Sequence, residues 1–170
     1  AGAQALAQLG YEDAVRHYER GLEALALRPP DEIARAWMQL SLGDASWRAG
    51  DVVKARETFE RVTRSARVLD EAELFARAAL GIARTSPETG APDHGLIALL
   101  DEARQRLGPA DGMLAAMVAA RLAMALYFTR AERERAALAE GAVAMARRLD
   151  DPAALVPALI THHFMLWGPG

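Results

Sequence analysis

The chain has 170 residues, 52% of them hydrophobic and 25% charged, which is the size and composition of one globular domain. It contains no cysteine, so disulfides within the chain, a thiolate nucleophile and a cysteine-based zinc site are excluded. The net charge is −3 and arginine is interleaved with glutamate, which argues against direct binding to nucleic acid. The most apolar run, 113–128, is too short to span a membrane and contains Arg121, so we expect a cytoplasmic protein.

Helix-forming residues dominate the sequence and β-branched residues are scarce, so we predict an all-α fold. Apolar periodicity, together with glycine, proline and aspartate at the breaks, divides the chain into helices. In chain order they cover about residues 2–9, 11–27, 31–49, 51–68, 70–85, 93–107, 111–128, 131–149 and 151–166. Aspartates near six of the predicted starts favour the helix dipole and can accept free N–H groups of the first turn: Asp31, Asp51, Asp70, Asp93, Asp111 and Asp151.

An internal repeat relates two distant parts of the chain. The segment 66–71 (ARVLDE) is similar to 146–151 (ARRLDD), and an apolar helical stretch follows each. Leu74 and Leu155 hold corresponding places in those stretches and lie 81 residues apart. This offset equals two units of about 40 residues, the length of a helix pair in helical repeat arrays.

One helix pair shows how a unit is built. Gly50 ends the helix over 31–49, and Asp51 begins the next helix. Gly43 lets a partner helix come close, while Ala55 and Phe59, four residues apart, face back onto the first helix. The spacing of Gly43, Ala55 and Phe59 resembles the small, small and aromatic consensus positions of the tetratricopeptide repeat family.

The resemblance to tetratricopeptide repeats extends along the chain. Gly2, Ala14 and Tyr18 match the same positions, whereas Ala123 and Arg135 depart from them in a later unit. It implies an all-α, right-handed α-solenoid of about four helical hairpins plus a terminal helix, forming a single domain over 1–170. The units would cover about 1–30, 31–69, 70–109, 110–150 and, as a partial unit, 151–170. Because a solenoid exposes apolar surface where it is cut, we expect a fragment of a longer protein that can self-associate through its ends.

The amino-acid sequence of the repeats resembles the C-terminal repeat region of large bacterial LuxR-type and related signal-transduction ATPase regulators. The resemblance is carried by LGDASWRAGDVVKARETFERV (42–62), ARVLDEAELFARAALG (66–81) and AVAMARRLDDPAAL (142–155). It implies a sensor or assembly arm that controls an ATPase and a DNA-binding module located elsewhere in a longer protein.

No motif for catalysis or for a cofactor emerges. A phosphate-binding loop needs glycine-rich backbone before a lysine, and the one lysine, Lys54, lies inside a predicted helix. His162 and His163 point about 100° apart on a helix, so they cannot coordinate the same metal ion. His17 and His94 have no acidic residue at the spacing of metal ligands. Acidic pairs fit helix caps and polar faces, and no serine has the sequence of a nucleophile elbow. We therefore predict that the chain is not an enzyme and holds neither metal nor cofactor.

A concave groove is the predicted functional site. In tetratricopeptide arrays the first helix of each unit lines such a groove, so the resemblance assigns groove positions by register. The principal positions are Trp37, Asp44, Trp47, Arg48, Phe75, Tyr127, His163 and Trp167, and the same register includes Leu40, Ala78, Ile82, Met117, Ala120, Met124 and Phe128. All three tryptophans fall in this set, and aromatic residues beside arginine are typical of binding hot spots. The alternative is that these aromatic residues fill the seams between neighbouring units.

Two functions are consistent with such a groove. The first is a protein–protein interaction or regulatory scaffold domain of a bacterial transcriptional regulator, which binds a protein or peptide partner or its own neighbouring domains. The alternative is an effector-sensing domain of the same type of regulator, in which the groove closes over a small molecule. An open apolar groove favours the first function, and an enclosed pocket with convergent polar groups favours the second.

Overall fold

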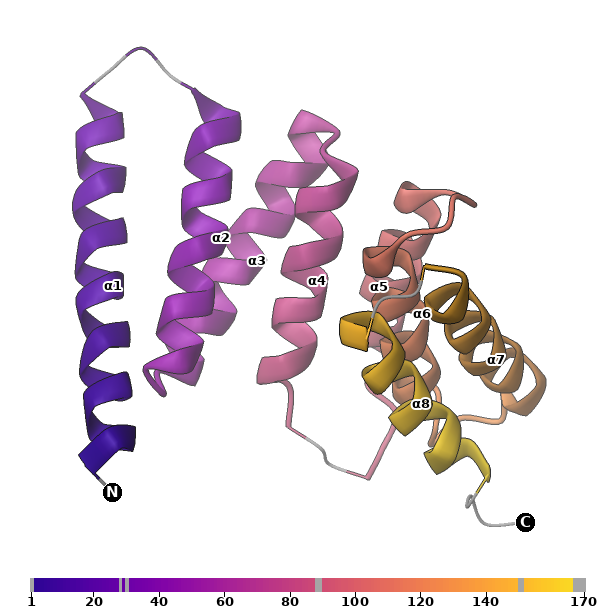
Figure 1. Cartoon of the computed structure of the whole chain (residues 1–170). Coiled ribbons are helices and arrows are strands. Elements are labelled where there is room, and N and C mark those ends of the chain that lie inside the picture. Colours follow the sequence, from indigo (N-terminus) through magenta and orange to yellow (C-terminus); the bar gives the residue numbers. More distant parts are fainter. Residues whose placement is uncertain (1, 28, 30, 88–89, 150–151, 167–170) are drawn as a thin grey trace. The chain divides into compact units, whose positions relative to one another are not determined.

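The computed structural model describes residues 2–27, 29, 31–87, 90–149 and 152–166. These residues form eight α-helices and no strand, which confirms the all-α prediction (Figure 1). The helices are α1 (Gly2–Ala26), α2 (Glu32–Arg48), α3 (Val52–Leu69), α4 (Ala72–Thr85), α5 (His94–Leu107), α6 (Met113–Ala125), α7 (Glu132–Leu149) and α8 (Pro152–Leu166). Among the described residues, no helix combines the length and the apolar character that crossing a membrane requires.

The helix boundaries agree with the prediction to within three residues from α2 to α8. The N-terminal part differs, because α1 is one continuous helix where the sequence predicts a break between 2–9 and 11–27. Gly10 lies inside α1, exposed, with open space where a Cβ would be. A glycine inside a helix costs about 1 kcal/mol relative to alanine, which weakens a helix of this length without ending it. The prediction of two helices was therefore wrong.

Three of the predicted aspartate caps are present. The Oδ1 atoms of Asp31, Asp51 and Asp93 each accept a hydrogen bond from the backbone N–H three residues further on, at 2.9, 3.0 and 3.0 Å. Each carboxylate thus satisfies one of the N–H groups that the first turn of α2, α3 or α5 leaves without a helical partner.

The predicted caps at Asp70 and Asp111 were wrong. Asp70 ends α3 in the left-handed conformation, with φ of 55°, and the next residue, Glu71, donates its N–H to the Ala66 carbonyl at 3.0 Å. Asp111 precedes Gly112, which is the N-cap residue of α6, and its carboxylate pairs with α7 instead. Asp151 lies outside the described residues.

The chain divides into two compact units, Ala1–Ser86 and Pro87–Gly170. Unit 1 contains α1 to α4, and unit 2 contains α5 to α8. The division falls inside the predicted third repeat, 70–109. The single domain over 1–170 and the repeat boundaries stay predictions.

Unit 1 is built around one aromatic ring. Helix α3 packs against both α2 and α4, which also contact each other (Figure 1). Phe59 of α3 is fully buried, and its ring lies against the backbone of Gly43 in α2 and of Gly81 in α4. A Cβ atom at either glycine would come within 2.7 Å of the ring, closer than carbon atoms can pack. The two glycines therefore allow α2 and α4 to approach α3 from both sides.

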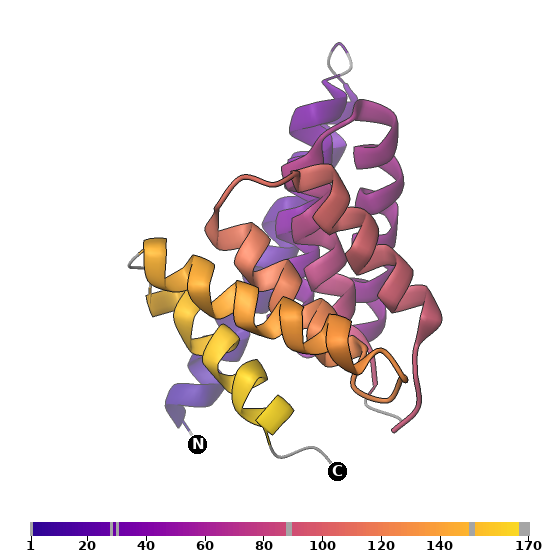
Figure 2. The same ribbon diagram turned by 90° about the vertical axis from the view of Figure 1, so that its right-hand side faces the viewer.

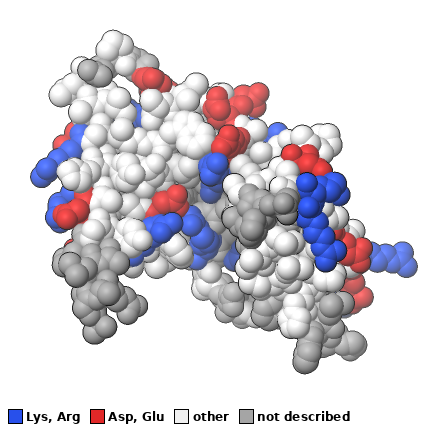
Figure 3. All heavy atoms as spheres, viewed as in Figure 1, with Lys and Arg blue, Asp and Glu red and all other residues white. Residues whose placement is uncertain are grey.

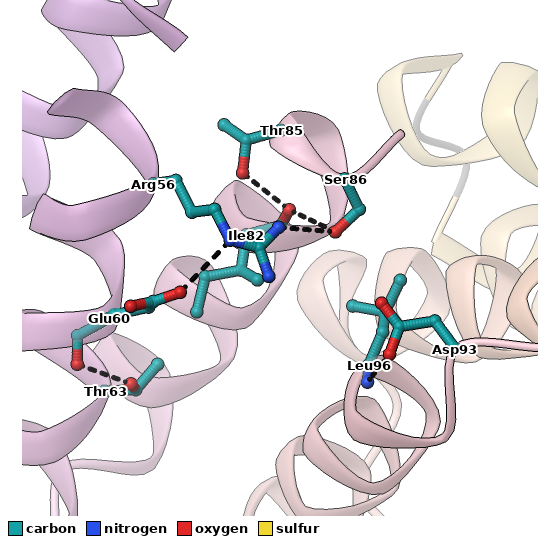
Figure 4. A network of polar contacts seen from close by, with 8 residues as sticks. All are labelled: Arg56, Glu60, Thr63, Ile82, Thr85, Ser86, Asp93 and Leu96. Carbon is teal, nitrogen blue, oxygen red and sulfur yellow. Dashed lines mark hydrogen bonds and ion pairs between the residues drawn. The ribbon is translucent and has the colours of Figure 1, made fainter. Parts of the chain in front are cut away.

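A network of hydrogen bonds connects the end of α4 to α3 (Figure 4). The Arg56 Nε donates to the Glu60 carboxylate at 3.1 Å, and its Nη1 donates to the Ser86 Oγ at 3.1 Å. Ser86 and Thr85 in turn donate their hydroxyls to the Ile82 carbonyl at 3.0 and 2.8 Å. Side chains thus satisfy a carbonyl that the last turn of α4 leaves without a helical N–H.

Unit 2 packs through small side chains. Helix α6 contacts α5, α7 and α8, and α7 also contacts α8 (Figure 2). The core shared by α6, α7 and α8 consists mainly of alanine, which lets helices approach closely: Ala116, Ala119, Ala120, Ala142, Val143, Ala146 and Ala158. Helices α6, α7 and α8 therefore make the same set of pairwise contacts as α2, α3 and α4.

Candidate functional site

Four of the principal predicted groove residues lie on α2: Trp37, Asp44, Trp47 and Arg48. The first three point toward α4, because each contacts an arginine of that helix. Arg48 turns the other way and contacts α1. The structure thus brings together a set of aromatic and charged side chains where α2 and α4 lie side by side.

The first contact pairs Trp37 with Arg77. The Arg77 guanidinium carbon lies 5.9 Å from the centroid of the Trp37 ring, within the range of a cation–π interaction. The same guanidinium forms an ion pair with Glu73, one turn earlier on α4, at 2.8 Å. Glu73 therefore holds Arg77 in place over the partly buried indole.

The second contact places Arg84 among three partners. Its guanidinium forms an ion pair with the Asp44 carboxylate, and its carbon lies 4.8 Å from the Trp47 ring centroid and 5.7 Å from that of Phe59. A planar guanidinium can bind a carboxylate through its edge and aromatic rings through its face. Arg84 thus links α2, α3 and α4 at a single point.

The two contacts share one register. Trp37 and Arg77 are 40 residues apart, as are Asp44 and Arg84, and on each helix the two positions are seven residues apart. Seven residues make about two helical turns, so α2 and α4 run in the same direction with matching residues side by side. We call the surface formed by Trp37, Asp44, Trp47, Arg77 and Arg84 the α2–α4 face.

Arg48 joins the α2–α4 face to α1. Its Nη1 donates to the Tyr11 hydroxyl at 3.4 Å, and its guanidinium carbon lies 5.6 Å from the Tyr11 ring centroid. Trp47, the neighbouring residue, keeps 36% of its surface exposed. Arg84 of α4 thus packs on the partly exposed indole, whereas Arg48, one residue along the chain, contacts α1.

The face is chemically mixed rather than dominated by one charge. Its two arginines both have carboxylate partners, Asp44 and the neighbouring Glu73. Figure 3 shows acidic and basic side chains in small, interspersed groups separated by uncharged surface, with no broad basic field on this side of the molecule. This distribution suits contacts in which aromatic area and hydrogen bonds matter more than net charge.

Phe75, a predicted groove residue, is fully buried, and the Arg67 guanidinium carbon lies 5.0 Å from its ring centroid. Ala78 and Ile82, which share its register, are buried as well. The prediction that these residues line an open groove was therefore wrong, because α4 turns its apolar stripe inward and presents Arg77 and Arg84 instead.

The remaining predicted residues belong to unit 2. Tyr127 is partly buried, its ring lies edge-on to that of Phe128 at 5.1 Å between centroids, and the Arg135 guanidinium carbon lies 5.1 Å from its centroid. His163 is exposed on α8. Trp167 lies outside the described residues.

Sequence reasoning missed Arg77 and Arg84. The available signal was their seven-residue spacing along one helix, which equals the spacing of Trp37 and Asp44 on another. Arginine also contacts aromatic rings elsewhere in the described chain, on Tyr11, Phe75 and Tyr127. The pairing of arginine with aromatic residues is therefore a recurrent feature of this sequence.

No group of three or more histidine, aspartate or glutamate side chains among the described residues could hold a metal ion. Neither the family models nor the curated proteins include a match to this chain. A functional interpretation therefore depends on the α2–α4 face itself.

Proposed function

We propose that the chain is a right-handed α-solenoid of tetratricopeptide type and that it binds a protein or peptide partner through the α2–α4 face. The solenoid is supported by Gly43 and Gly81, which lie 38 residues apart and hold opposite sides of the Phe59 ring. It is also supported by the contact pattern of α6, α7 and α8, which repeats that of α2, α3 and α4.

The observation that carries the binding function is the environment of Trp47. This indole is 36% exposed, and Arg84 covers part of it while being held by Asp44 and Phe59. Tryptophan and arginine are enriched among the residues that dominate binding energy at interfaces. Because Arg84 is already ordered by several contacts, its own side chain would lose little entropy when a partner docks against it.

The partner in this proposal is a protein segment, either from another molecule or from a neighbouring domain of the same protein. The context of a bacterial LuxR-type or signal-transduction ATPase regulator is supported by the sequence resemblance of segments 42–62, 66–81 and 142–155. In that context the domain is a scaffold, and its binding state is transmitted to a module elsewhere in the regulator.

A peptide-display selection on the immobilised chain tests the proposal. Peptides recovered on the wild type are measured against Trp47→Ala and Arg84→Ala, with Val53→Ala as the control, because Val53 is 70% exposed on α3. A hot-spot residue contributes about 2 kcal/mol or more, so we expect Trp47→Ala to weaken binding by about 30-fold. Val53→Ala should leave the Kd unchanged. Peptides that bind Trp47→Ala and Arg84→Ala as tightly as the wild type would show that the α2–α4 face is not the site.

A further inference from the structure

A shallow hollow lies between α7 and α8 in unit 2, with a volume of about 220 Å³. Both helices contribute to its lining, which consists of Glu140, Val143, Ala144, Arg147, Leu159 and His162. Three of these six side chains are apolar and three carry ionisable groups. None of them belongs to the α2–α4 face, so the hollow is independent of the proposed function.

The lining has a regular order along α7. Glu140, Val143, Ala144 and Arg147 are spaced by three or four residues, so they form one stripe of the helix surface. The two apolar residues lie in the middle of the stripe, and the charged residues lie at its ends. With a rise of 1.5 Å per residue, the two charged positions are separated by about 10 Å along the helix axis.

Helix α8 supplies the opposite wall. Since only two residues separate α7 from α8, the two helices run in opposite directions, and residues equally far from this connection face each other. Leu159 therefore lies opposite the apolar middle of the stripe, and His162 lies toward Glu140. One end of the hollow thus carries a carboxylate and an imidazole, and the other end carries a guanidinium.

The two charged side chains of α7, Glu140 and Arg147, are exposed. Among the described residues, neither Glu140 nor Arg147 forms an ion pair or a side-chain hydrogen bond, whereas the adjacent Arg148 is bound to Asp111. Their separation also prevents them from pairing with each other. The hollow therefore offers a hydrogen-bond acceptor at one end, a donor at the other and apolar surface between them.

We propose that this hollow binds a short zwitterionic peptide with an apolar central residue, about three residues long. Three residues of extended chain span about 10 Å, which matches the separation of the Glu140 and Arg147 positions along the helix axis. The ligand ammonium binds the Glu140 carboxylate, with His162 beside it, and the ligand carboxylate binds the Arg147 guanidinium. The central side chain lies on Val143, Ala144 and Leu159. The volume is below the roughly 300–1,000 Å³ of sites for larger ligands, which favours a ligand of this size.

Methyl NMR titration of the full chain with the tripeptide Ala-Leu-Ala tests the proposal. We expect saturable shifts of the Val143 and Leu159 methyl signals. Acetylation of the peptide removes its ammonium charge and amidation removes its carboxylate charge, so each should weaken binding by about tenfold. Glu140→Gln should weaken binding of the free peptide to the same extent but leave the acetylated peptide unaffected. Arg147→Gln should behave in the same way toward the amidated peptide.

Arg133→Gln and Glu134→Gln are the matched controls, because both positions are exposed in the first turn of α7 and outside the hollow. They should leave the affinity unchanged. The proposal is wrong if the Val143 and Leu159 signals show no saturable shift at about 10 mM peptide. It is equally wrong if the blocked peptides bind as tightly as the free one, or if Glu140→Gln and Arg147→Gln behave like the controls.

Discussion

The Phe59 ring lies directly against the backbone of Gly43, so closely that a Cβ atom at Gly43 would be 2.6 Å from the ring Cε1. Gly81 occupies the opposite side of the same ring, where a Cβ atom would be 2.7 Å from Cδ1. Because the ring is fully buried and both glycines lie against it, the ring has little room to move away from an added methyl group. The spacing of α2, α3 and α4 therefore depends on the absence of a side chain at two positions.

We expect Gly43→Ala and Gly81→Ala to destabilise the protein. Alanine improves the helix by about 1 kcal/mol over glycine, but forcing a methyl group into a filled core costs about 1–3 kcal/mol. The second effect should dominate because Phe59 cannot retreat. Urea unfolding followed by circular dichroism measures the change in the free energy of unfolding.

Gly141→Ala provides the matched control for this prediction. Gly141 is exposed inside α7, and open space surrounds the place of its Cβ. The substitution should stabilise the protein by about 0.5–1 kcal/mol, because it brings the helix gain without the clash. In a Phe59→Leu background, Gly81→Ala should cost less than in the wild type. Equal effects of alanine at Gly81 and Gly141 would contradict the packing described for Phe59.

The sequence allowed the Gly43–Phe59 contact to be predicted, but not the residues that stand at the corresponding positions of unit 2. Eighty residues further along the chain, Ala123 and Ala139 stand where Gly43 and Phe59 stand in unit 1, and both are buried. Compared with unit 1, the first helix of the pair thus has a larger residue, alanine instead of glycine. The second helix has a smaller one, alanine instead of phenylalanine. Glycine is required on the first helix only where a bulky ring packs against it, so a consensus applied to each position separately does not anticipate an alanine at 123 combined with an alanine at 139.

Helix boundaries were predictable where capping chemistry decides them, as at Asp51, and less so elsewhere. Asp70 was assigned to the start of a helix because aspartate favours that place. It ends α3 instead, since a short polar side chain also tolerates the left-handed conformation. An aspartate that begins a helix and an aspartate that ends one therefore cannot be told apart from the residue type alone.

The candidate site was predictable only within one helix. Helical periodicity places Trp37, Asp44 and Trp47 on related positions of α2, and all three point toward α4. Arg77 and Arg84 were missed because the side of α4 that faces α2 depends on packing between helices, which a single helix does not encode.

We expect Gly50→Ala to destabilise the end of α2. Gly50 has φ of 90°, and the following residue, Asp51, donates its N–H to the Ser46 carbonyl at 2.9 Å. A side chain in this conformation costs about 1–2 kcal/mol, because its Cβ crowds the backbone. Gly50→Asn should lose less, since asparagine tolerates positive φ. Thermal unfolding measures both variants, and an equal loss for alanine and asparagine would show that φ is not the cause.

We expect Ser46→Ala to stabilise the protein. Ser46 is fully buried, and its Oγ has no hydrogen-bond partner among the described residues. An unsatisfied buried hydroxyl carries a desolvation penalty of about 1–3 kcal/mol, which alanine avoids while keeping the same Cβ. Ser41→Ala is the control, because the Ser41 hydroxyl donates to the Trp37 carbonyl at 3.2 Å and its loss brings no such gain. A lower free energy of unfolding for Ser46→Ala than for the wild type would contradict this account.

The pKa of Asp111 should depend on Arg148. The Arg148 Nε and Nη2 donate to the two Asp111 carboxylate oxygens at 2.5 and 2.9 Å, joining the end of α7 to the residue before the N-cap of α6. These hydrogen bonds, with the positive charge of the guanidinium, hold the pKa of Asp111 below its ordinary value of 3.8. In Arg148→Gln, we expect an NMR titration of the Asp111 carboxyl carbon to show a pKa returned toward that value.

The same pair has a defined effect on stability. Because the pKa of Asp111 is lower in the folded state than in the unfolded state, the pair stabilises the fold fully at pH values above the unfolded value. Its contribution is lost as the pH falls through the lowered folded value. The difference in the free energy of unfolding between the wild type and Arg148→Gln should therefore be constant near neutral pH and shrink in acid. Both residues are exposed, so added salt should reduce the difference at neutral pH. A difference that persists unchanged in acid would mean that Arg148 stabilises the fold through packing of its side chain and not through the Asp111 carboxylate.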